Sequence, residues 1–181
     1  MNKTHRVDVV GLQRELPIIT VPSGVRLAVF NMLGDIEMTK AAGRELAARL
    51  HLRHPDIIVT TETKSVPLAY EIASLLELPY VVLRKSYVSY MGEALETKVQ
   101  SITLGHPRTI YLDARDQGLC GGKRVAIVDD VISTGSTLAA MRSLLTRAGA
   151  TIVAESAVFT EGDRGKWPSV IALGHLPVFA E

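Results

Sequence analysis

The chain has 181 residues, of which 47% are hydrophobic and 22% charged, as in an ordinary globular protein of one domain. Its 20 basic and 19 acidic residues leave a net charge of +1, which argues against bulk electrostatic binding to nucleic acid or to a membrane. The single cysteine, Cys120, excludes an internal disulfide and a metal site built from several thiolates. We therefore expect a cytoplasmic protein with no nucleic-acid or membrane partner.

Short β-branched runs alternate with helical patterns, which predicts an α/β fold: a mainly parallel, twisted sheet with helices on both faces. The expected strands are 25–30, 56–61, 80–85, 108–113, 123–130 and 151–159, and the expected helices are 36–50, 65–78 and 136–149. Asp35 is typical of a helix N-cap. The segment 86–107 fits neither pattern and is interpreted as a flexible loop. Ligands of such sheets bind beyond the carboxyl ends of the strands, so residues that follow strands are the site candidates.

The stretch VAIVDDVISTGST at 125–137 places two acids at a strand end, before a loop that opens into a helix. Asp129 and Asp130 can accept hydrogen bonds from vicinal hydroxyls or lie near a hydrated divalent cation. The loop offers hydroxyls, a glycine and the N–H groups of a helix start, which favour a phosphate. Its residues are Ser133, Thr134, Gly135, Ser136 and Thr137. A diol or metal site beside a monophosphate site fits a ribose 5-phosphate.

Two other interpretations of this stretch are weaker. Apolar residues followed by an acid also occur in the Walker B strand of nucleoside triphosphatases. The glycine-rich stretch 118–124, however, has the wrong spacing for a Walker A loop and carries Arg124 where Ser or Thr should bind magnesium. The second alternative is a buried strand whose acids only cap a turn, and two adjacent acids before a loop of Ser, Thr and Gly argue against it.

The same stretch, 125–137, resembles the signature with which type I phosphoribosyltransferases bind 5-phosphoribosyl 1-diphosphate. The family usually has a second glycine where Ser136 stands, a departure that should preserve the loop. The resemblance implies that Asp129 and Asp130 contact the ribose hydroxyls and, indirectly, a Mg²⁺ cofactor. It also implies that both acids are catalytic residues. It further implies that residues 133–137 bind the 5-phosphate.

The resemblance also implies how the chain is divided. A single phosphoribosyltransferase domain would span residues 1–181, with a small hood lobe added to the α/β core. The implied parts are the core at about 35–157, the hood at about 1–34 and 158–181, and the flexible loop at about 86–107.

The stretch VTTETKSVPLAYEIA at 59–73 resembles the diphosphate loop of purine phosphoribosyltransferases and of the related purine-repressor effector domains. It is a second strand–loop–helix junction, with backbone amides at a helix start and a cation beside them. Lys64 stands where adenine phosphoribosyltransferases usually carry Arg, so the charge is kept and the bidentate fork is lost. The implied diphosphate-binding residues are Glu62, Thr63, Lys64, Ser65, Arg84 and Lys85, of which Lys85 is also a catalytic candidate. The alternative for the loop is an ordinary helix start that is exposed to solvent and binds no ligand. The alternative for Arg84 and Lys85 is a basic pair that is only solvated.

Phe30 and Phe159 are candidates to stack on a purine base, although a position in the apolar core is the default expectation for each. Adenine phosphoribosyltransferases commonly place a Glu in the flexible loop, just before an aromatic residue and a glycine. This chain has Thr, Leu and Gly at 103–105 instead, and its loop acids Glu93 and Glu96 are offset. The identity of the base therefore stays open.

The function implied by the resemblance is a purine phosphoribosyltransferase of nucleotide salvage, with adenine as the favoured base. It would transfer the 5-phosphoribosyl group from 5-phosphoribosyl 1-diphosphate to the base, release diphosphate and act as a homodimer. One alternative is a xanthine- or hypoxanthine-specific enzyme. Another is a ligand-sensing regulator with this fold and no catalysis, to which the likeness of 59–73 to repressor domains points. Because the net charge is near zero and no winged-helix segment is expected, the enzyme is the favoured interpretation.

Overall fold

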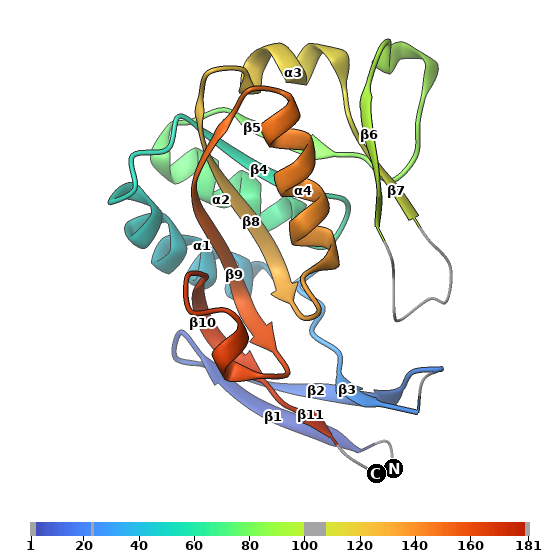
Figure 1. Cartoon of the computed structure of the whole chain (residues 1–181). Helices are drawn as coiled ribbons and strands as arrows, with labels where there is room; N and C mark the ends of the chain where they lie inside the picture. Colours follow the sequence, from blue (N-terminus) through green and yellow to red (C-terminus); the bar gives the residue numbers. More distant parts are fainter. Residues whose placement is uncertain (1–2, 23, 100–107, 180–181) are drawn as a thin grey trace.

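The computed structural model describes residues 3–22, 24–99 and 108–179, and its centre is a five-stranded parallel sheet (Figure 1). The strand order is β10-β9-β8-β4-β5, and every neighbouring pair in it is parallel. The strands are β4 (Ile57–Thr61), β5 (Tyr80–Leu83), β8 (Arg124–Ile132), β9 (Thr151–Glu161) and β10 (Ile171–Leu176). The predicted α/β fold with a mainly parallel sheet is confirmed.

Helices cover both faces of this sheet because its strands are apolar on both sides. On β8, Ala126 and Val128 belong to the core shared with α1 (Ile36–His51) and α2 (Val66–Leu76). Val125 and Ile127 alternate with them and pack with α4 (Ser136–Arg147) on the opposite face. Figure 1 shows α1 and α2 on one side of the sheet and α4 on the other, while the short α3 (Ala114–Cys120) precedes β8.

A second, antiparallel sheet of four strands forms a small lobe below the core sheet (Figure 1). Its order is β1-β2-β3-β11, and its strands are β1 (Thr4–Val9), β2 (Leu12–Thr20), β3 (Arg26–Ala28) and β11 (Val178–Phe179). The two-residue turn of the β1–β2 hairpin has positive φ at both Val10 and Gly11 (51° and 76°), as a type I′ turn requires. This hairpin is absent from the strands expected from sequence, since an alternating exposed strand carries a weak apolar pattern.

The C-terminal segment divides between the two sheets, which differs from the expectation that residues 158–181 belong to the hood. β9 continues to Glu161, and the chain then turns back through the short 3₁₀ helix η2 (Arg164–Lys166). β10 pairs in parallel with β9 as the edge strand of the core sheet, and only β11 pairs with β3 in the lobe. The strand pairing therefore gives the lobe a single short C-terminal strand.

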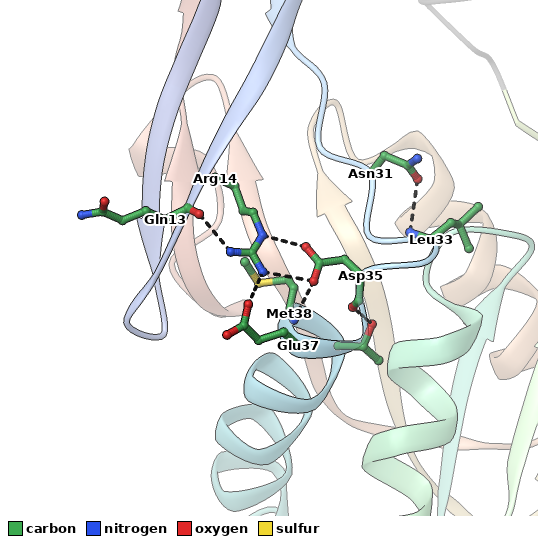
Figure 2. A network of polar contacts seen from close by, with 8 residues as sticks. Gln13, Arg14, Asn31, Leu33, Asp35, Glu37 and Met38 are labelled. Atoms are coloured by element: carbon green, nitrogen blue, oxygen red, sulfur yellow. Dashed lines mark hydrogen bonds and ion pairs between the residues drawn. The ribbon is translucent and has the colours of Figure 1, made fainter.

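A charged network ties the lobe to the start of α1 (Figure 2). Arg14 on β2 donates to both carboxylate oxygens of Asp35, at 2.7 and 3.1 Å, and to Glu37 at 2.8 Å. Asp35 also accepts from the backbone N–H of Met38 at 3.0 Å, which confirms it as the N-cap of α1. The Arg14 guanidinium is the main cause that lowers the pKa of Asp35. Asp35 therefore stays charged and joins the lobe to the core helix.

The remaining strands, β6 (Leu95–Val99) and β7 (Arg108–Leu112), form an antiparallel pair beside α4 (Figure 1). The described part of the predicted flexible loop, 86–99, holds β6 and the 3₁₀ helix η1 (Ser89–Met91). Residues 100–107, with the Thr-Leu-Gly at 103–105, lie outside the described residues, so the flexibility of 86–107 stays a prediction. Among the described residues, no helix combines the length and the apolar character needed to cross a membrane.

Candidate active site

Two loops meet at the carboxyl edge of the core sheet because β4 and β8 are parallel neighbours. The first, the hydroxyl loop, comprises residues 133–137 and leads from β8 into α4. The second, the lysine loop, comprises residues 62–65 and leads from β4 into α2. The hydroxyl of Ser65 lowers the pKa of Asp129 on β8, so the two loops act on the same carboxyl. The structure thus brings together two stretches that are about 70 residues apart in the chain.

A cavity of about 260 Å³ opens at this edge beside α4. Its wall contains Lys85, Asp129 and the whole of the hydroxyl loop, 133–137, all of them predicted site residues. In the part of the chain that the structure describes, the other predicted residues lie outside that wall: the lysine loop, Phe30, Arg84, Asp130 and Phe159. The wall therefore has hydroxyl, ammonium and carboxylate groups in one hollow.

The two acids at the end of β8 have different surroundings. Asp129 is buried, with 8% of its surface exposed, whereas Asp130 is half-buried. The pKa of Asp129 is raised to about 8, mainly by burial and also by the neighbouring charge of Asp130. The Asp129 Oδ1 atom accepts a hydrogen bond of 2.9 Å from the backbone N–H of Asp130. Because burial disfavours the charged form of Asp129, a ligand that donates a hydrogen bond or carries a positive charge would stabilise its carboxylate.

The hydroxyl loop has the conformation of an anion site. Gly135 is the N-cap of α4 with φ of +83°, a region that favours glycine, and it caps the helix with no side-chain hydrogen bond. Thr134 Oγ1 lies 3.2 Å from Ser136 Oγ and accepts weakly, at 3.4 Å, from the Ser136 N–H. The remaining N–H groups of the first turn of α4 are therefore available to an anion at the positive end of its dipole.

The lysine loop contains a cis peptide bond between Glu62 and Thr63. Its Lys64 donates through Nζ to the backbone oxygen of Phe30 at 3.1 Å, so this cation reaches toward the chain that enters α1. The buried Ser65 accepts from the hydroxyl of Thr60 at 2.8 Å and donates to the backbone oxygen of Thr61 at 3.2 Å. These bonds fix the start of α2 against the end of β4.

The basic pair after β5 is held by Glu62. Glu62 Oε1 lies 2.5 Å from Arg84 Nε, and Glu62 Oε2 accepts from the backbone N–H of Lys85 at 2.7 Å. Arg84 also donates to the hydroxyl of Tyr90 at 3.0 Å, and this bond, together with the charge of Glu62, raises the pKa of Arg84. The Glu62 carboxylate is thus ion-paired with the guanidinium of Arg84 and hydrogen-bonded to the backbone of Lys85.

Phe30 and Phe159 are core residues in this structure, which agrees with the default expectation for each rather than with base stacking. They are 4% and 1% exposed and belong to the core cluster shared with α1 and α2. Their rings meet edge to face, with centroids 4.9 Å apart and planes at 76°. Neither residue belongs to the described wall of the cavity.

The cavity wall also holds two charged residues that sequence reasoning missed, Arg108 and Glu161. Glu161 is buried at the carboxyl end of β9, and this burial raises its pKa, an effect that the Ser133 side chain and the charge of His175 partly offset. The expected strand ends at 159, two residues before β9 does, so Glu161 is not marked as a strand-end residue by the sequence. Arg108 begins β7, and no local motif marks it.

The comparisons with known proteins identify the family. The family model described as "Phosphoribosyl transferase domain" matches residues 30–170 of this chain. The chain belongs to the phosphoribosyltransferase family. Both loops of the site lie inside the matched region, so the family match covers the candidate site as a whole.

Two curated relatives illustrate the range of the similarity. The hypoxanthine/guanine phosphoribosyltransferase of Methanococcus voltae is 40% identical over 108 residues, which cover 60% of this chain and 54% of the relative. The purine biosynthesis transcriptional activator PurR of Lactococcus lactis is 29% identical over 132 residues, which cover 73% of this chain and 48% of the relative. The chain therefore spans about half the length of these curated relatives.

A solved structure confirms the fold along nearly the whole chain. The adenine phosphoribosyltransferase of Thermoanaerobacter pseudethanolicus superposes with a TM-score of 0.67 at 19% identity. The superposition covers 96% of this chain and 95% of the solved one. At this identity the likeness shows the type I phosphoribosyltransferase fold and carries no argument about the base.

The conformation of Gly135 yields a stability prediction. A Cβ added at Gly135 would lie 2.1 Å from the ring of Trp167, in addition to the cost of a side chain at positive φ. Gly34 is the matched control, since its φ is +84° and the space around its missing Cβ is open. We expect Gly34→Ala to lower the free energy of unfolding by about 1 kcal/mol and Gly135→Ala by at least twice as much. Equal losses in urea denaturation would show that the Trp167 contact does not constrain the loop.

The raised pKa of Asp129 yields a prediction about pH. From an unfolded value near 3.8 the folded pKa rises to about 8, so folding favours the protonated carboxyl, and the stability it contributes is lost as the pH rises through that interval. Replacing Asp129 by Asn removes this dependence. We expect Asp129→Asn and the native chain to differ little in their free energies of unfolding near pH 4, and the variant to be the more stable of the two at pH 8. Parallel stability curves between these pH values would contradict the assignment.

Proposed function

We propose that this protein is a purine phosphoribosyltransferase that transfers the 5-phosphoribosyl group of 5-phosphoribosyl 1-diphosphate to a purine base and releases diphosphate. The observation that carries the proposal is the meeting of the hydroxyl loop, the acids of β8 and the lysine loop at one sheet edge, in a chain of this family. The phosphates at the two ends of the sugar donor would bind to one loop each. The ribose would lie between them, next to Asp129 and Asp130.

The proposed reaction depends on charge placement. Loss of diphosphate leaves an oxocarbenium-like sugar, so the protein must stabilise an anionic leaving group and fix the sugar in place. The backbone amides of the hydroxyl loop would bind the 5-phosphate, and Asp129 and Asp130 would accept hydrogen bonds from the ribose hydroxyls. Lys64, Arg84 and Lys85 would then bind the departing diphosphate.

The predicted diphosphate-binding cations already have partners that an anion can replace. Lys64 is bonded to a backbone carbonyl oxygen, and Arg84 is paired with Glu62. A diphosphate carries more negative charge than either partner and can accept from several donors at once. Binding of the donor would therefore exchange these internal bonds for bonds to the ligand.

The acids of β8 fit a magnesium ion that is bound mostly by substrate and water. Magnesium in proteins is commonly held by one or two carboxylates together with substrate phosphates. Asp129 and Asp130 supply two carboxylates, and within the described ranges no group of three or more His, Cys, Asp or Glu side chains could hold a metal ion without a substrate. When bound with the donor, such an ion would neutralise part of the charge of the diphosphate.

For the base we propose a 6-oxopurine, hypoxanthine or guanine, because a relative with 40% identity carries that name. Adenine, favoured by the sequence alone, is the alternative, and the solved adenine enzymes bear on the fold only. A regulator without catalysis is the second candidate function, since the transcriptional activator of Lactococcus lactis matches 73% of this chain.

The test is diphosphate release from 5-phosphoribosyl 1-diphosphate with magnesium and adenine, hypoxanthine, guanine or xanthine in turn. We expect turnover with a 6-oxopurine. The double substitution Asp129→Asn with Asp130→Asn should lower kcat/KM by at least about 100-fold with an unchanged circular dichroism spectrum, because the sugar loses its anchors. Binding of the donor without turnover of any base would favour the regulator, and unchanged activity of the double variant would contradict the assigned roles.

We further propose that the protein is a homodimer that associates through the exposed apolar side chains of α1, α2 and β5. Ile36, Tyr70 and Tyr80 are 70%, 57% and 39% exposed, and together with Pro67 they line one hollow. Large apolar side chains gathered on one face are typical of an interface.

The association is tested by sedimentation velocity of the native chain and of two single variants. Ile36→Asp should shift a dimer toward monomer, because a charge would be buried in the interface. Leu52→Asp, which changes a 74% exposed residue just beyond the other end of α1, should not. A native chain that sediments as a monomer, or equal effects of the two substitutions, would contradict this surface as the interface.

A further inference from the structure

The short helix η2 and the residue after it lie against the outside of the hydroxyl loop. Trp167 Nε1 donates to the backbone oxygen of Ser133 at 3.2 Å, and Lys166 Nζ donates to the backbone oxygen of Thr134 at 3.0 Å. The donors follow their acceptors by 34 and 32 residues in the chain. Neither Lys166 nor Trp167 belongs to the described wall of the cavity. Both therefore touch the loop from the side away from the proposed ligand.

These two bonds fix the direction of two peptide groups. In a trans peptide the C=O of one residue and the N–H of the next point in opposite directions. The peptides after Ser133 and Thr134 are trans, since the one cis bond among the described residues is that of Glu62 and Thr63. Holding these two carbonyl oxygens on the outer side directs the following N–H groups, those of Thr134 and Gly135, toward the opposite side.

The opposite side is where an anion needs them. The whole of 133–137 lines the cavity, so N–H groups turned inward are offered to a phosphate. If a peptide lost its outer bond and flipped, it would present a carbonyl oxygen to the same phosphate. The partial negative charge of that oxygen would repel the phosphate. The outer bonds thus decide whether the loop attracts or repels an anion.

The contact is fixed by packing as well as by hydrogen bonds. The ring of Trp167 occupies the space in which a Cβ of residue 135 would lie, and the indole packs against the core cluster of α4. Lys166 Nζ lies 5.0 Å from the centroid of that ring. The turn that carries them is closed by Asp163, which accepts from the N–H of Gly165 at 2.8 Å and from that of Lys166 at 3.2 Å.

We propose that Trp167 and Lys166 are positioning residues for the 5-phosphate: they hold the outer carbonyl groups of the hydroxyl loop so that its amides face the ligand. The inference rests on the proposed function, because it takes the 5-phosphate to be bound by this loop. The 5-phosphate is remote from the bond that breaks, so the two residues contribute equally to binding of the ground state and of the transition state. Their loss therefore raises KM for the donor and leaves kcat nearly unchanged.

The test compares Trp167→Phe, Lys166→Met and Lys166→Arg with the native chain. Calorimetry measures the Kd for ribose 5-phosphate and for inorganic diphosphate, and kinetics give KM and kcat for the donor. Trp167→Phe keeps an aromatic ring and removes the N–H donor, and Lys166→Met keeps the length and removes the ammonium. Each should weaken ribose 5-phosphate about 5- to 10-fold, the effect of one lost hydrogen bond, and raise KM similarly. Diphosphate affinity and kcat should change by less than about twofold, and Lys166→Arg should retain affinity.

The control is Arg164→Met, which removes the same charge from the same turn. Among the described contacts Arg164 has no hydrogen bond to the loop, so we expect less than about a twofold effect. If Arg164→Met weakened the binding of ribose 5-phosphate as much as Lys166→Met, the effect of Lys166 would be a general attraction of positive charge for the phosphate. That result would overturn the positioning role of Lys166. Native affinity of Trp167→Phe for ribose 5-phosphate, or an equal loss for diphosphate, would overturn the role of Trp167. A native chain that does not bind ribose 5-phosphate would instead refute the proposed function itself.

Discussion

Strands β4 and β8 run in parallel and are hydrogen-bonded neighbours, with Val59 opposite Ile127. Because both end at the same edge of the sheet, the loops that follow them converge there, and every feature of the candidate site depends on that convergence. Asp129 lies at the junction, where it is buried and where Ser65 of the other loop lowers its pKa. The helices α2 and α4 begin directly after these loops, so both direct their N-terminal amides toward the same edge.

The site separates charges that nearly cancel over the whole chain. Lys64, Arg84 and Lys85 follow β4 and β5, whereas Asp129 and Asp130 stand at the end of β8. In the free protein the charge on each side of the site is offset by the protein itself. Glu62 pairs with Arg84, while burial favours the protonated form of Asp129. The charged groups of the site are therefore stabilised when no ligand is bound. An anion that enters would replace Glu62 as the partner of Arg84, and a cation would replace the proton of Asp129.

The sequence was most informative where the chemistry is local. The acids and the hydroxyl loop occupy one unbroken stretch, 125–137, and the family match and the fold agree with the interpretation of that stretch. Asp35 as the N-cap of α1 and the buried strand that became β8 were predictable for the same reason. In each case the residues that interact are a few positions apart, and their types and spacing carry the signal.

The features that the sequence did not reveal depend on contacts between distant segments. Phe30 and Phe159 are aromatic residues of the kind that can stack on a base. Only the fold shows that they pack on each other. Trp167 sits in a turn with no recognisable motif, yet it contacts a loop 34 residues earlier. The β1–β2 hairpin of the lobe was missed because half of its side chains are exposed, which weakens the apolar pattern that marks a strand.

The most direct test of the two-loop site is a crystal structure of the protein with 5-phosphoribosyl 1-diphosphate bound. The account predicts that the 5-phosphate lies against the amides of 133–137, that the ribose hydroxyls contact Asp129 and Asp130, and that the diphosphate lies against 62–65. In that complex Arg84 should have exchanged Glu62 for the ligand. A donor bound in the opposite direction, or at another edge of the sheet, would contradict the account.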